Sequence, residues 1–396
     1  MLYAQGGGGS GWRAIPSCMA ASCHGFRLVG GGTGRRAVSR TKRSSAATTA
    51  AASSGEALGA TIVSFGRRFT TERRLSWRSV PRLPVLGHDA VLRAVPPRLA
   101  IERVREALVH FHKGDWAMPP KVYLESPPDG DFRAMPARGD GFALLKWVTS
   151  FPGNPARGLP TVTGLISLSD ARTGELLMVL DGRSVTALRT GAVAAVASAA
   201  LASPDARSVG IVGCGLHGAW TARCLIAAGF GGGVCHDARP EAAAALAAEL
   251  GPAWSAGSRE EAVRCEIVCC ITPGASIVID ASDLRPGLHL NMLGADGPGK
   301  AEATVEAVAA CSLYCDEWEQ ASHGGELTGA VAAGAVTRAS VTELGAVLAG
   351  DSLGRPGPEA VTLFDSTGLA IQDLAVSAAA FEAWREGRVE AQFVRL

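Results

Sequence analysis

Two side chains in this sequence could move protons, and the first is a lysine among apolar residues. Lys146 lies in the segment F-A-L-L-K-W-V-T. A lysine enclosed in such a strand is costly unless it is paired or functional, and desolvation would lower its pKa toward proton transfer or imine chemistry. The alternative is an amphipathic strand whose polar face meets water, and the pattern by itself favours that alternative.

The second is Asp296, which follows an apolar stretch in L-G-A-D-G-P-G-K. If that stretch is a strand of a parallel sheet, the aspartate lies at the carboxyl end, where ligands of such sheets bind. A carboxylate there could take a proton from an amine or activate a water. It could equally serve a turn, and the residues leave both interpretations open. As an active pair, Lys146 and Asp296 would have to meet across a cleft.

Several cations could bind an anionic ligand. Lys121, Arg133 and Arg189 occur in M-P-P-K, F-R-A-M-P and L-R-T-G-A. Clustered in space they would bind a carboxylate, each arginine through a bidentate pair, whereas as isolated residues they are surface charges. Lys300 could reach a phosphate or face solvent.

A glycine-rich turn predicts a dinucleotide site. The apolar run 209–212 breaks at G-C-G-L-H-G (213–218) and continues into an Ala-rich helical segment. Gly213 permits the tight turn, Gly215 lets a diphosphate approach the backbone, and Gly218 lets the helix pack on the strand. The free N–H groups at the start of the helix would face the phosphates.

Asp237 ends the next apolar run, in V-C-H-D-A-R. A carboxylate at this point is suited to hold the ribose hydroxyls of the adenosine, and it favours NAD because a 2′-phosphate would meet like charge. Arg239 could accommodate that phosphate, so NADP stays open.

Two patterns position these residues. Short β-like segments separated by turns follow a helix at 97–112 and suggest an antiparallel or mixed sheet: 121–124, 131–135, 142–149, 161–167 and 176–181. From Ser208 to about Thr342 strands alternate with helices, which implies a parallel sheet. We therefore expect an α/β protein with a doubly wound, Rossmann-type sheet and an α+β domain.

Composition excludes some classes of function. The 396 residues suffice for two domains, and a net charge of +1 gives no reason to expect nucleic acid as a partner. No apolar run reaches the length of about eighteen residues that a membrane span needs, and 191–202 is interpreted as a buried helix. The spacing of the ten cysteines supports neither disulfides nor a metal site, so buried thiols in a reducing, intracellular compartment are expected.

The N-terminal segment differs from the rest. Residues 1–55 contain no Asp or Glu, several arginines and much Gly, Ser and Ala. Such a composition is typical of a transit peptide to a mitochondrion or plastid, or of a disordered extension of a cytoplasmic protein. Residues 56–80 are basic and poorly patterned, and ordered structure is expected from about Leu83.

Eight segments of the chain, taken together, resemble one family. They are M-P-P-K-V-Y-L (118–124), F-R-A-M-P-A (132–137), L-L-K-W-V-T-S-F-P-G-N-P (144–155), G-L-P-T-V (158–162), T-A-L-R-T-G-A (186–192), G-I-V-G-C-G (210–215), G-A-D-G-P-G-K-A-E (294–302) and L-F-D-S-T-G-L-A-I-Q-D (363–373). Their order and content are similar to the ornithine cyclodeaminase/mu-crystallin family, over about residues 83 to 396.

The resemblance implies roles for individual residues. Lys121 and Lys146 would contact the substrate carboxylate, Lys146 would also transfer a proton, and Asp296 would be the acid/base group beside the substrate nitrogen. Thr367 would border the substrate. The residues implied to line the dinucleotide site, besides the three glycines, are Thr161, Arg189, Leu216, His217, Asp237, Thr272, Asn291, Lys300 and Ser366.

Three residues bear on the subgroup. Asp296 is usually absent from the mu-crystallin type, and the cyclodeaminases usually lack Arg133 and favour arginine at the position of Lys121. These features resemble the alanine dehydrogenase-like members, in which Arg133 and Lys121 would clamp the carboxylate of a small amino acid. His217 replaces the more usual glutamine of the family's turn.

The resemblance thus implies NAD(P)-dependent deamination of a small L-amino acid through an imine. Ornithine cyclodeamination with internally recycled NAD, reduction of a ketimine or pyrroline-2-carboxylate, and a non-catalytic NAD(P)-binding protein are the alternatives. It also implies a homodimer. The expected organisation is an extension (1–82), a substrate-binding and dimerisation domain (83–204), a dinucleotide domain (205–342) and a segment returning to the substrate domain (343–396).

Overall fold

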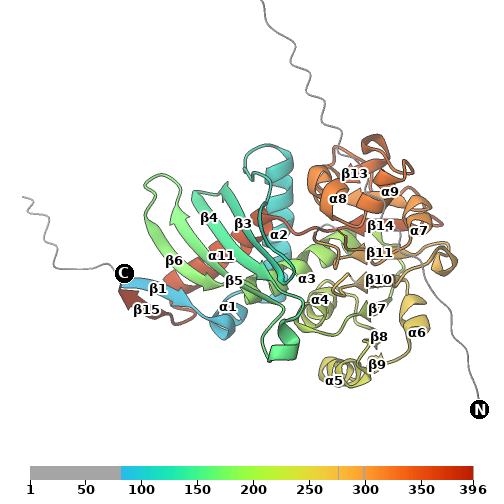
Figure 1. The fold of residues 1–396 in the computed structure, drawn as a ribbon, viewed down its shortest axis with the longest axis horizontal. Coiled ribbons are helices and arrows are strands. Elements are labelled where there is room, and N and C mark those ends of the chain that lie inside the picture. The colour runs from blue at the N-terminus through green and yellow to red at the C-terminus, as the bar shows by residue number, and fades with distance from the viewer. Residues whose placement is uncertain (1–81, 275, 298, 396) are drawn as a thin grey trace, which may run out of the picture. The chain divides into compact units, whose positions relative to one another are not determined.

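The computed structural model describes residues 82–274, 276–297 and 299–395. The expectation of a transit-like or disordered extension falls on residues 1–82, almost all of which lie outside the described residues. The described residues contain two β-sheets with helices between and around them (Figure 1).

The first sheet has seven strands in the order β15-β1-β6-β5-β4-β3-β2. Strands β1 and β6 pair in parallel, and the other neighbours are antiparallel. The strands are β1 (Arg82–Leu86), β2 (Val122–Ser126), β3 (Gly130–Gly139), β4 (Phe142–Ser150), β5 (Val162–Asp170), β6 (Leu176–Asp181) and β15 (Gln392–Arg395). The mixed sheet expected from the short alternating segments is therefore confirmed.

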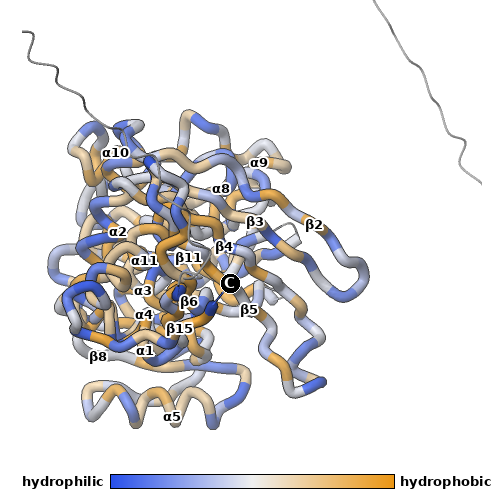
Figure 2. Tube along the Cα trace, turned by 90° about the vertical axis from the view of Figure 1, so that its left-hand side faces the viewer, coloured by the Kyte–Doolittle hydropathy of each residue, from blue (hydrophilic) through white to orange (hydrophobic). Residues whose placement is uncertain are grey.

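Three helices pack on this sheet: α1 (His88–Ala94), α3 (Gly182–Leu201) and α11 (Ala370–Arg385). A fourth helix, α2 (Pro97–His112), packs on α3 and α11. Among the described helices α3 has the length and apolar composition of a membrane span, but 83% of that window is buried within the fold. It begins at Asp181, whose carboxylate accepts the N–H of Ser184 as an N-cap. Figure 2 shows hydrophobic chain gathered around α11 and β11. Helix α3 is thus a core helix.

The second sheet has eight parallel strands in the order β13-β12-β14-β11-β10-β7-β8-β9. They are β7 (Ser208–Val212), β8 (Gly232–His236), β9 (Trp254–Ala256), β10 (Ile267–Cys270), β11 (His289–Met292), β12 (Ser312–Cys315), β13 (Val341–Glu343) and β14 (Thr362–Asp365). Helices accompany them: α4 (Leu216–Ala227), α5 (Pro240–Leu250), α6 (Arg259–Val263), α7 (Val305–Ala309), α8 (Trp318–Gly324), α9 (Thr328–Ala332) and α10 (Leu344–Ala349). This is the parallel, Rossmann-type sheet that the alternation predicts.

The last fifty residues join the two sheets. Strand β14 lies inside the parallel sheet, between β11 and β12. The chain then passes through the turn 366–369 into α11, which packs on β3 and β4, and ends in β15, which pairs with β1. The turn between β14 and α11 therefore lies where the carboxyl ends of the parallel strands approach the first sheet.

Candidate active site

The glycine turn has the shape that the sequence predicts. Gly213 takes φ +101°, and a Cβ added to Gly218 would collide with the carbonyl oxygen of Gly213. At Gly215, by contrast, an added Cβ would meet no atom within 4 Å. Two of the glycines thus serve the turn and the packing of α4 on β7, and the third leaves open space beside the backbone.

This turn fits a dinucleotide. The first intrahelical hydrogen bond of α4 runs from the Ala219 N–H to Gly215 O, so the N–H groups of residues 216–218 precede it and are available to a diphosphate. The carboxylate of Asp237 accepts the N–H groups of Cys214 at 2.8 Å and of Arg239 at 2.9 Å. Burial favours its neutral form, but these two N–H groups outweigh burial and lower the pKa of Asp237.

Lys146 lies on the interior face of β4, and the prediction that it faces water was wrong. Its side chain is buried, whereas its apolar neighbours Leu145 and Trp147 are 44% and 41% exposed on the other face. The strand is amphipathic, but the face that carries the ammonium group points to the interior, and the face that carries Leu145 and Trp147 points to solvent. The first interpretation of Lys146, a lysine that must be paired or functional, is the one that the structure retains.

The ammonium group of Lys146 has two acceptors. Its Nζ donates to Asp373 Oδ1 at 2.9 Å and to Thr186 Oγ1 at 2.8 Å. Arg189 Nε lies 3.6 Å from the same Asp373 oxygen. Burial lowers the pKa of Lys146 to about 8, although the charge of Asp373 raises it. Lys146 therefore titrates within reach of neutral pH, as a proton-transfer group requires.

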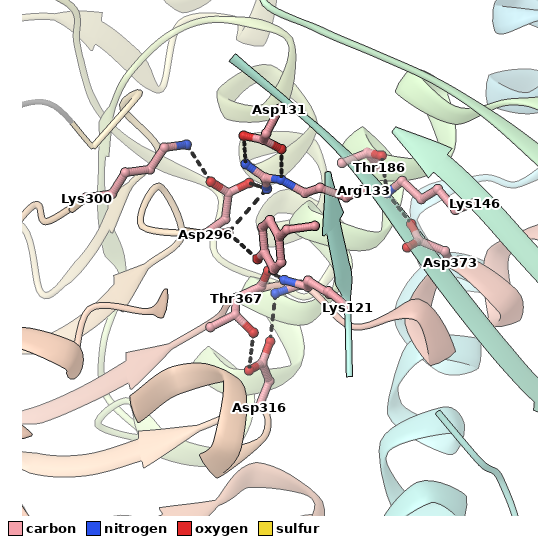
Figure 3. A network of polar contacts seen from close by, with 12 residues as sticks. Lys121, Asp131, Arg133, Lys146, Thr186, Asp296, Lys300, Asp316, Thr367 and Asp373 are labelled. Atoms are coloured by element: carbon pink, nitrogen blue, oxygen red, sulfur yellow. Dashed lines mark hydrogen bonds and ion pairs between the residues drawn. The ribbon is translucent and has the colours of Figure 1, made fainter. Parts of the chain in front are cut away.

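Asp296 lies between two cations in the loop after β11, as Figure 3 shows. Its Oδ2 accepts from Arg133 Nη1 at 2.9 Å, and its Oδ1 accepts from Lys300 Nζ. Burial alone would raise its pKa, but the charges of Lys300 and Arg133 hold the pKa well below its usual range. The carboxylate is ionised at neutral pH.

Arg133 is held on two sides. Besides Asp296, its guanidinium donates from Nε and Nη2 to the two carboxylate oxygens of Asp131, at 2.5 and 3.1 Å. It also lies over the ring of Tyr123, 5.3 Å from the ring centroid. Arg133 thus fixes Asp296 in this structure, and a substrate carboxylate would have to compete with two protein carboxylates for it.

Lys121 enters the site from the residue before β2. Its Nζ donates to the main-chain oxygen of Thr367 at 2.7 Å. Burial lowers the pKa of Lys121 to about 8, while the charges of Asp296 and Asp316 raise it. The cation and the turn after β14 are therefore joined in one polar network with Asp296 (Figure 3).

The carboxylate of Asp316 fixes the turn between β14 and α11 through hydrogen bonds. It accepts the hydroxyls of Ser366 and Thr367, both at 3.1 to 3.2 Å, and the N–H of Gly368 at 2.9 Å. The side chains of Ser366 and Thr367 are thus engaged by the protein, and it is the main chain of Thr367 that meets Lys121.

The remaining predicted residues are distributed more widely. Asn291 is fully buried in β11, where its Nδ2 donates to Ser198 Oγ at 2.9 Å. The hydroxyl of Thr272 donates to Glu302, which also accepts the N–H groups of Thr272 and Gly294. Leu216 and His217 open α4, and Thr161 precedes β5; all three are partly buried.

His217 shares the electrostatic surroundings of the site. Burial, together with the charges of Arg189 and Lys146, lowers the pKa of His217 to about 4. Its ring is therefore neutral at physiological pH.

Lys146 and Asp296 do not pair directly. Each has other partners, but the charge of Asp296 acts on Lys146, which puts the two in one electrostatic neighbourhood. The expected meeting of the pair is therefore a proximity that the charge of Asp296 bridges, without a direct contact.

Five buried carboxylates were missed in the sequence: Glu302, Asp316, Glu326, Asp365 and Asp373. Asp373 stands alone among apolar residues of α11, in L-A-I-Q-D-L-A-V. The argument that singles out Lys146, a charge enclosed in an apolar segment, applies equally to Asp373 and would have found it.

A cavity of about 230 Å³ lies elsewhere, between α2, α11 and the β3–β4 turn. None of the residues discussed above lines it; its lining residues are Arg103, Glu106, His110, Trp116, Asp140, Ala375 and Ala378.

Comparison with known proteins shows which family and which proteins this chain is similar to. The model of the ornithine cyclodeaminase/mu-crystallin family matches residues 90–388. An alanine dehydrogenase of Archaeoglobus fulgidus is 42% identical over 303 residues, which cover 75% of this chain and 94% of that protein.

Two solved structures are similar over most of the chain. An archaeal alanine dehydrogenase dimer with bound NAD superposes with a TM-score of 0.76 and 38% identity, covering 80% of this chain and all of that one. The Δ1-pyrroline-2-carboxylate reductase of Thermococcus litoralis, in complex with NADH and L-proline, has a TM-score of 0.74 and 26% identity, covering 79% and 100%.

Proposed function

Because this chain belongs to the ornithine cyclodeaminase/mu-crystallin family, we propose that it is an NAD-dependent dehydrogenase that deaminates a small L-amino acid. The observation that carries the proposal is the convergence of Lys121, Arg133 and Asp296, contributed by both sheets, on one polar network. A carboxylate-binding cation beside an ionised acid/base group is what an amino-acid substrate requires.

The cofactor site is proposed on the glycine turn. The N–H groups of residues 216–218 and the open space at Gly215 would receive the diphosphate, and Asp237 would meet the adenosine ribose. A carboxylate at this place supports NAD over NADP, although the neighbouring Arg239 leaves room for the latter. Held at this turn, NAD would supply the acceptor for a hydride from the substrate Cα, and loss of that hydride would convert the amine to an imine.

The chain's own residues bind and orient the substrate. Lys121 would pair with the substrate carboxylate, and its hydrogen bond to Thr367 O keeps the ammonium group in place. Asp296, ionised and fixed by Arg133 and Lys300, would accept a proton from the substrate amine or from the water that attacks the imine. Lys146 would exchange the further proton, since its pKa of about 8 is suited to both directions.

Two features favour the dehydrogenase over the other reactions of the family. Arg133 and Lys121 have the residue types that resemble the alanine dehydrogenase-like members, and the alanine dehydrogenase of A. fulgidus is 42% identical. A cyclodeaminase would return the hydride to its substrate-derived imine, so the two reactions differ in stoichiometry.

The two sheets would have different binding functions. We infer that the seven-stranded sheet and its helices bind substrate and a second copy of the chain, and that the eight-stranded sheet binds the dinucleotide. The outer face of β4 and β5 exposes Leu145, Trp147 and Leu165, an apolar surface of the kind that subunits cover. The archaeal alanine dehydrogenase is a dimer, which supports the same assembly here.

The test is incubation of the purified protein with NAD and a panel of L-amino acids. Reduced nicotinamide is followed by absorbance, and ammonia is assayed separately. Equal amounts of ammonia and reduced cofactor from a small amino acid are the expected result. Ammonia without reduced cofactor would identify a cyclodeaminase, and turnover of cyclic imines alone would identify a reductase.

A further inference from the structure

Asp373 lies directly behind Lys146 and has no part in the steps described above. It belongs to the largely apolar helix α11, next to the buried Gln372, and its side chain is fully buried. Its Oδ1 accepts from Lys146 Nζ at 2.9 Å and lies 3.6 Å from Arg189 Nε. Three elements, β4, α3 and α11, thus each bring one charged group to the same point. Figure 3 shows Lys146 and Asp373 of this cluster.

This cluster is not a saturated ion pair. Two cations share a single carboxylate oxygen, so the group carries a net positive charge. Asp373 Oδ2 and Arg189 Nε are both buried and have no hydrogen-bond partner among the described residues. A purely structural contact would be built better from apolar side chains, because buried charges are expensive to desolvate. Two cations on one carboxylate suit a place that receives an anionic ligand.

The orientation of Lys146 is fixed at the same time. Thr186 Oγ1 accepts from Lys146 Nζ at 2.8 Å and itself donates to Gly182 O at 2.5 Å. An ammonium group has three N–H donors, and Asp373 and Thr186 take two of them. One N–H of Lys146 is left for the substrate.

We propose that Asp373 is a positioning residue of this enzyme: it directs the ammonium group of Lys146 and sets the charge of that group, while Arg189 competes for the same carboxylate oxygen. The proposal rests on the proposed function of Lys146 as the group that exchanges a proton with the substrate.

The charged groups that face Lys146 come from every element around it. Burial is the largest influence and lowers its pKa; Asp373 from α11 and Asp296 from the loop after β11 raise the pKa, and Arg189 from α3 lowers it. His217 from α4 feels the charge of Lys146 and is neutral near pH 7. Removing Asp373 or Arg189 should therefore move the titration of Lys146 in opposite directions.

The experiment measures Lys146 itself, in the full chain, by carbon NMR of protein labelled at the lysine ε-carbon, with the signal assigned through Lys146→Arg. The wild-type midpoint is expected at about 8. Asp373→Asn keeps the shape of the side chain but removes its charge, and should lower the midpoint by about 1 to 2 pH units. Arg189→Gln should raise it. Ser377→Ala, which removes a buried hydroxyl one turn further along α11, is the matched control and should leave it unchanged.

Kinetics separate positioning from mere support of the fold. For Asp373→Asn, kcat should follow a pH profile displaced in the same direction as the Lys146 titration. A loss of activity that is uniform over pH, together with an unmoved Lys146 midpoint, would overturn the proposal. If Asp373→Asn does not fold, a midpoint that fails to rise in Arg189→Gln overturns it by itself.

Failure of the proposed function would look different. In that case the wild-type protein would turn over no amino acid in the panel, while the opposite shifts of the Lys146 titration would still be observed.

Discussion

Asp296 is an anion held in place by neighbouring cations, and these contacts determine the expected effect of replacing it. Arg133 and Lys300 donate to it, and Lys121 adds a favourable charge. Such a carboxylate is a weak base in the empty site, so its proton affinity must rise when the substrate separates it from Arg133 or Lys300. Its catalytic role therefore depends on substrate.

Asp296→Asn should abolish most turnover while the cofactor still binds. The amide keeps the size of the side chain but cannot accept a proton, so kcat should fall by at least about 100-fold. NADH affinity, measured by isothermal titration calorimetry, should stay close to the wild-type value. Asp131→Asn, which weakens the other side of Arg133 and leaves Asp296 intact, is the control and should cost much less in kcat. Equal loss of turnover and NADH binding would contradict the assignment of Asp296.

The charge of Lys121 should set the pH dependence of substrate binding. Its pKa is lowered to about 8, so the ammonium group loses its proton as the pH rises through 8 and no longer pairs with a carboxylate. KM for the amino acid should then rise about tenfold per pH unit above that point, as expected for loss of one charged group. Initial rates between pH 6 and 10 measure this.

Lys121→Arg provides the decisive comparison. A guanidinium stays charged throughout this range, so the rise of KM should disappear in the variant. Lys113→Arg, at the exposed end of α2, serves as the control and should keep the wild-type profile. A rise of KM that persists unchanged in Lys121→Arg would show that another group titrates.

Sequence could predict the cations of the site and Asp296, but it could not predict the buried carboxylates Asp316 and Asp373 or how the charges are paired. Lys146 and Asp296 stand out by their apolar or loop surroundings, and the glycines of the turn by their spacing. The burial of Lys146 was predicted wrongly because alternation in β4 does not say which face is inside when both faces carry apolar residues. The hydrogen bond to Asp373 connects residues 227 positions apart, and no local pattern records such a contact.

At the scale of elements, the turn between β14 and α11 connects the cations of the site. Asp316 accepts from Ser366, Thr367 and Gly368, and Thr367 O accepts from Lys121. On its other side Gly368 lies against the guanidinium of Arg189. The turn 366–369 thus holds groups from both sheets at fixed separations.

Gly368→Ala should weaken cofactor binding through Arg189. Gly368 has φ +77°, and an added Cβ would lie 2.5 to 2.7 Å from the guanidinium atoms, so Arg189 must move. NADH affinity should fall about tenfold, equivalent to roughly 1.4 kcal/mol, and calorimetric titration measures it. The left-handed backbone adds a loss of about 1 kcal/mol in the free energy of unfolding.

Gly350→Ala is the matched control for that variant. Gly350 ends α10 with φ +84°, and an added Cβ there would meet nothing within 4 Å. The two variants should therefore lose similar stability in thermal unfolding, but only Gly368→Ala should lose NADH affinity. Equal affinities in the two would mean that Arg189 does not bind the cofactor.

Long and locally patterned elements were predicted best. The bounds of α2 and β6 agree with the predicted ranges 97–112 and 176–181, because a 3.6-residue stripe and a clean turn define them. Strands β1 and β15 pair across almost the whole described chain, and β14 is a four-residue strand in the middle of the parallel sheet. Such pairings are decided by tertiary contacts, which is why they were not assigned from sequence.

At the scale of the whole molecule, the outer face of the seven-stranded sheet exposes large apolar side chains. Trp147 and Leu165 are paired neighbours on β4 and β5, and they are 41% and 52% exposed. Leu145 lies on the same face, and β2 exposes Val122 and Leu124. A contiguous apolar face of this kind is unfavourable in water and is characteristic of a subunit contact.

Trp147→Glu combined with Leu165→Glu should therefore convert a dimer into monomers. The two carboxylates would be buried without partners in the contact and would face each other across neighbouring strands. Light scattering after size-exclusion chromatography should show twice the chain mass for the wild type and the single chain mass for the variant. Leu353→Glu, at a leucine that is 88% exposed in the loop before β14, should stay dimeric. If the double variant keeps the wild-type mass, the subunits meet through another surface, because two buried, unpaired carboxylates would disrupt a contact made through this face.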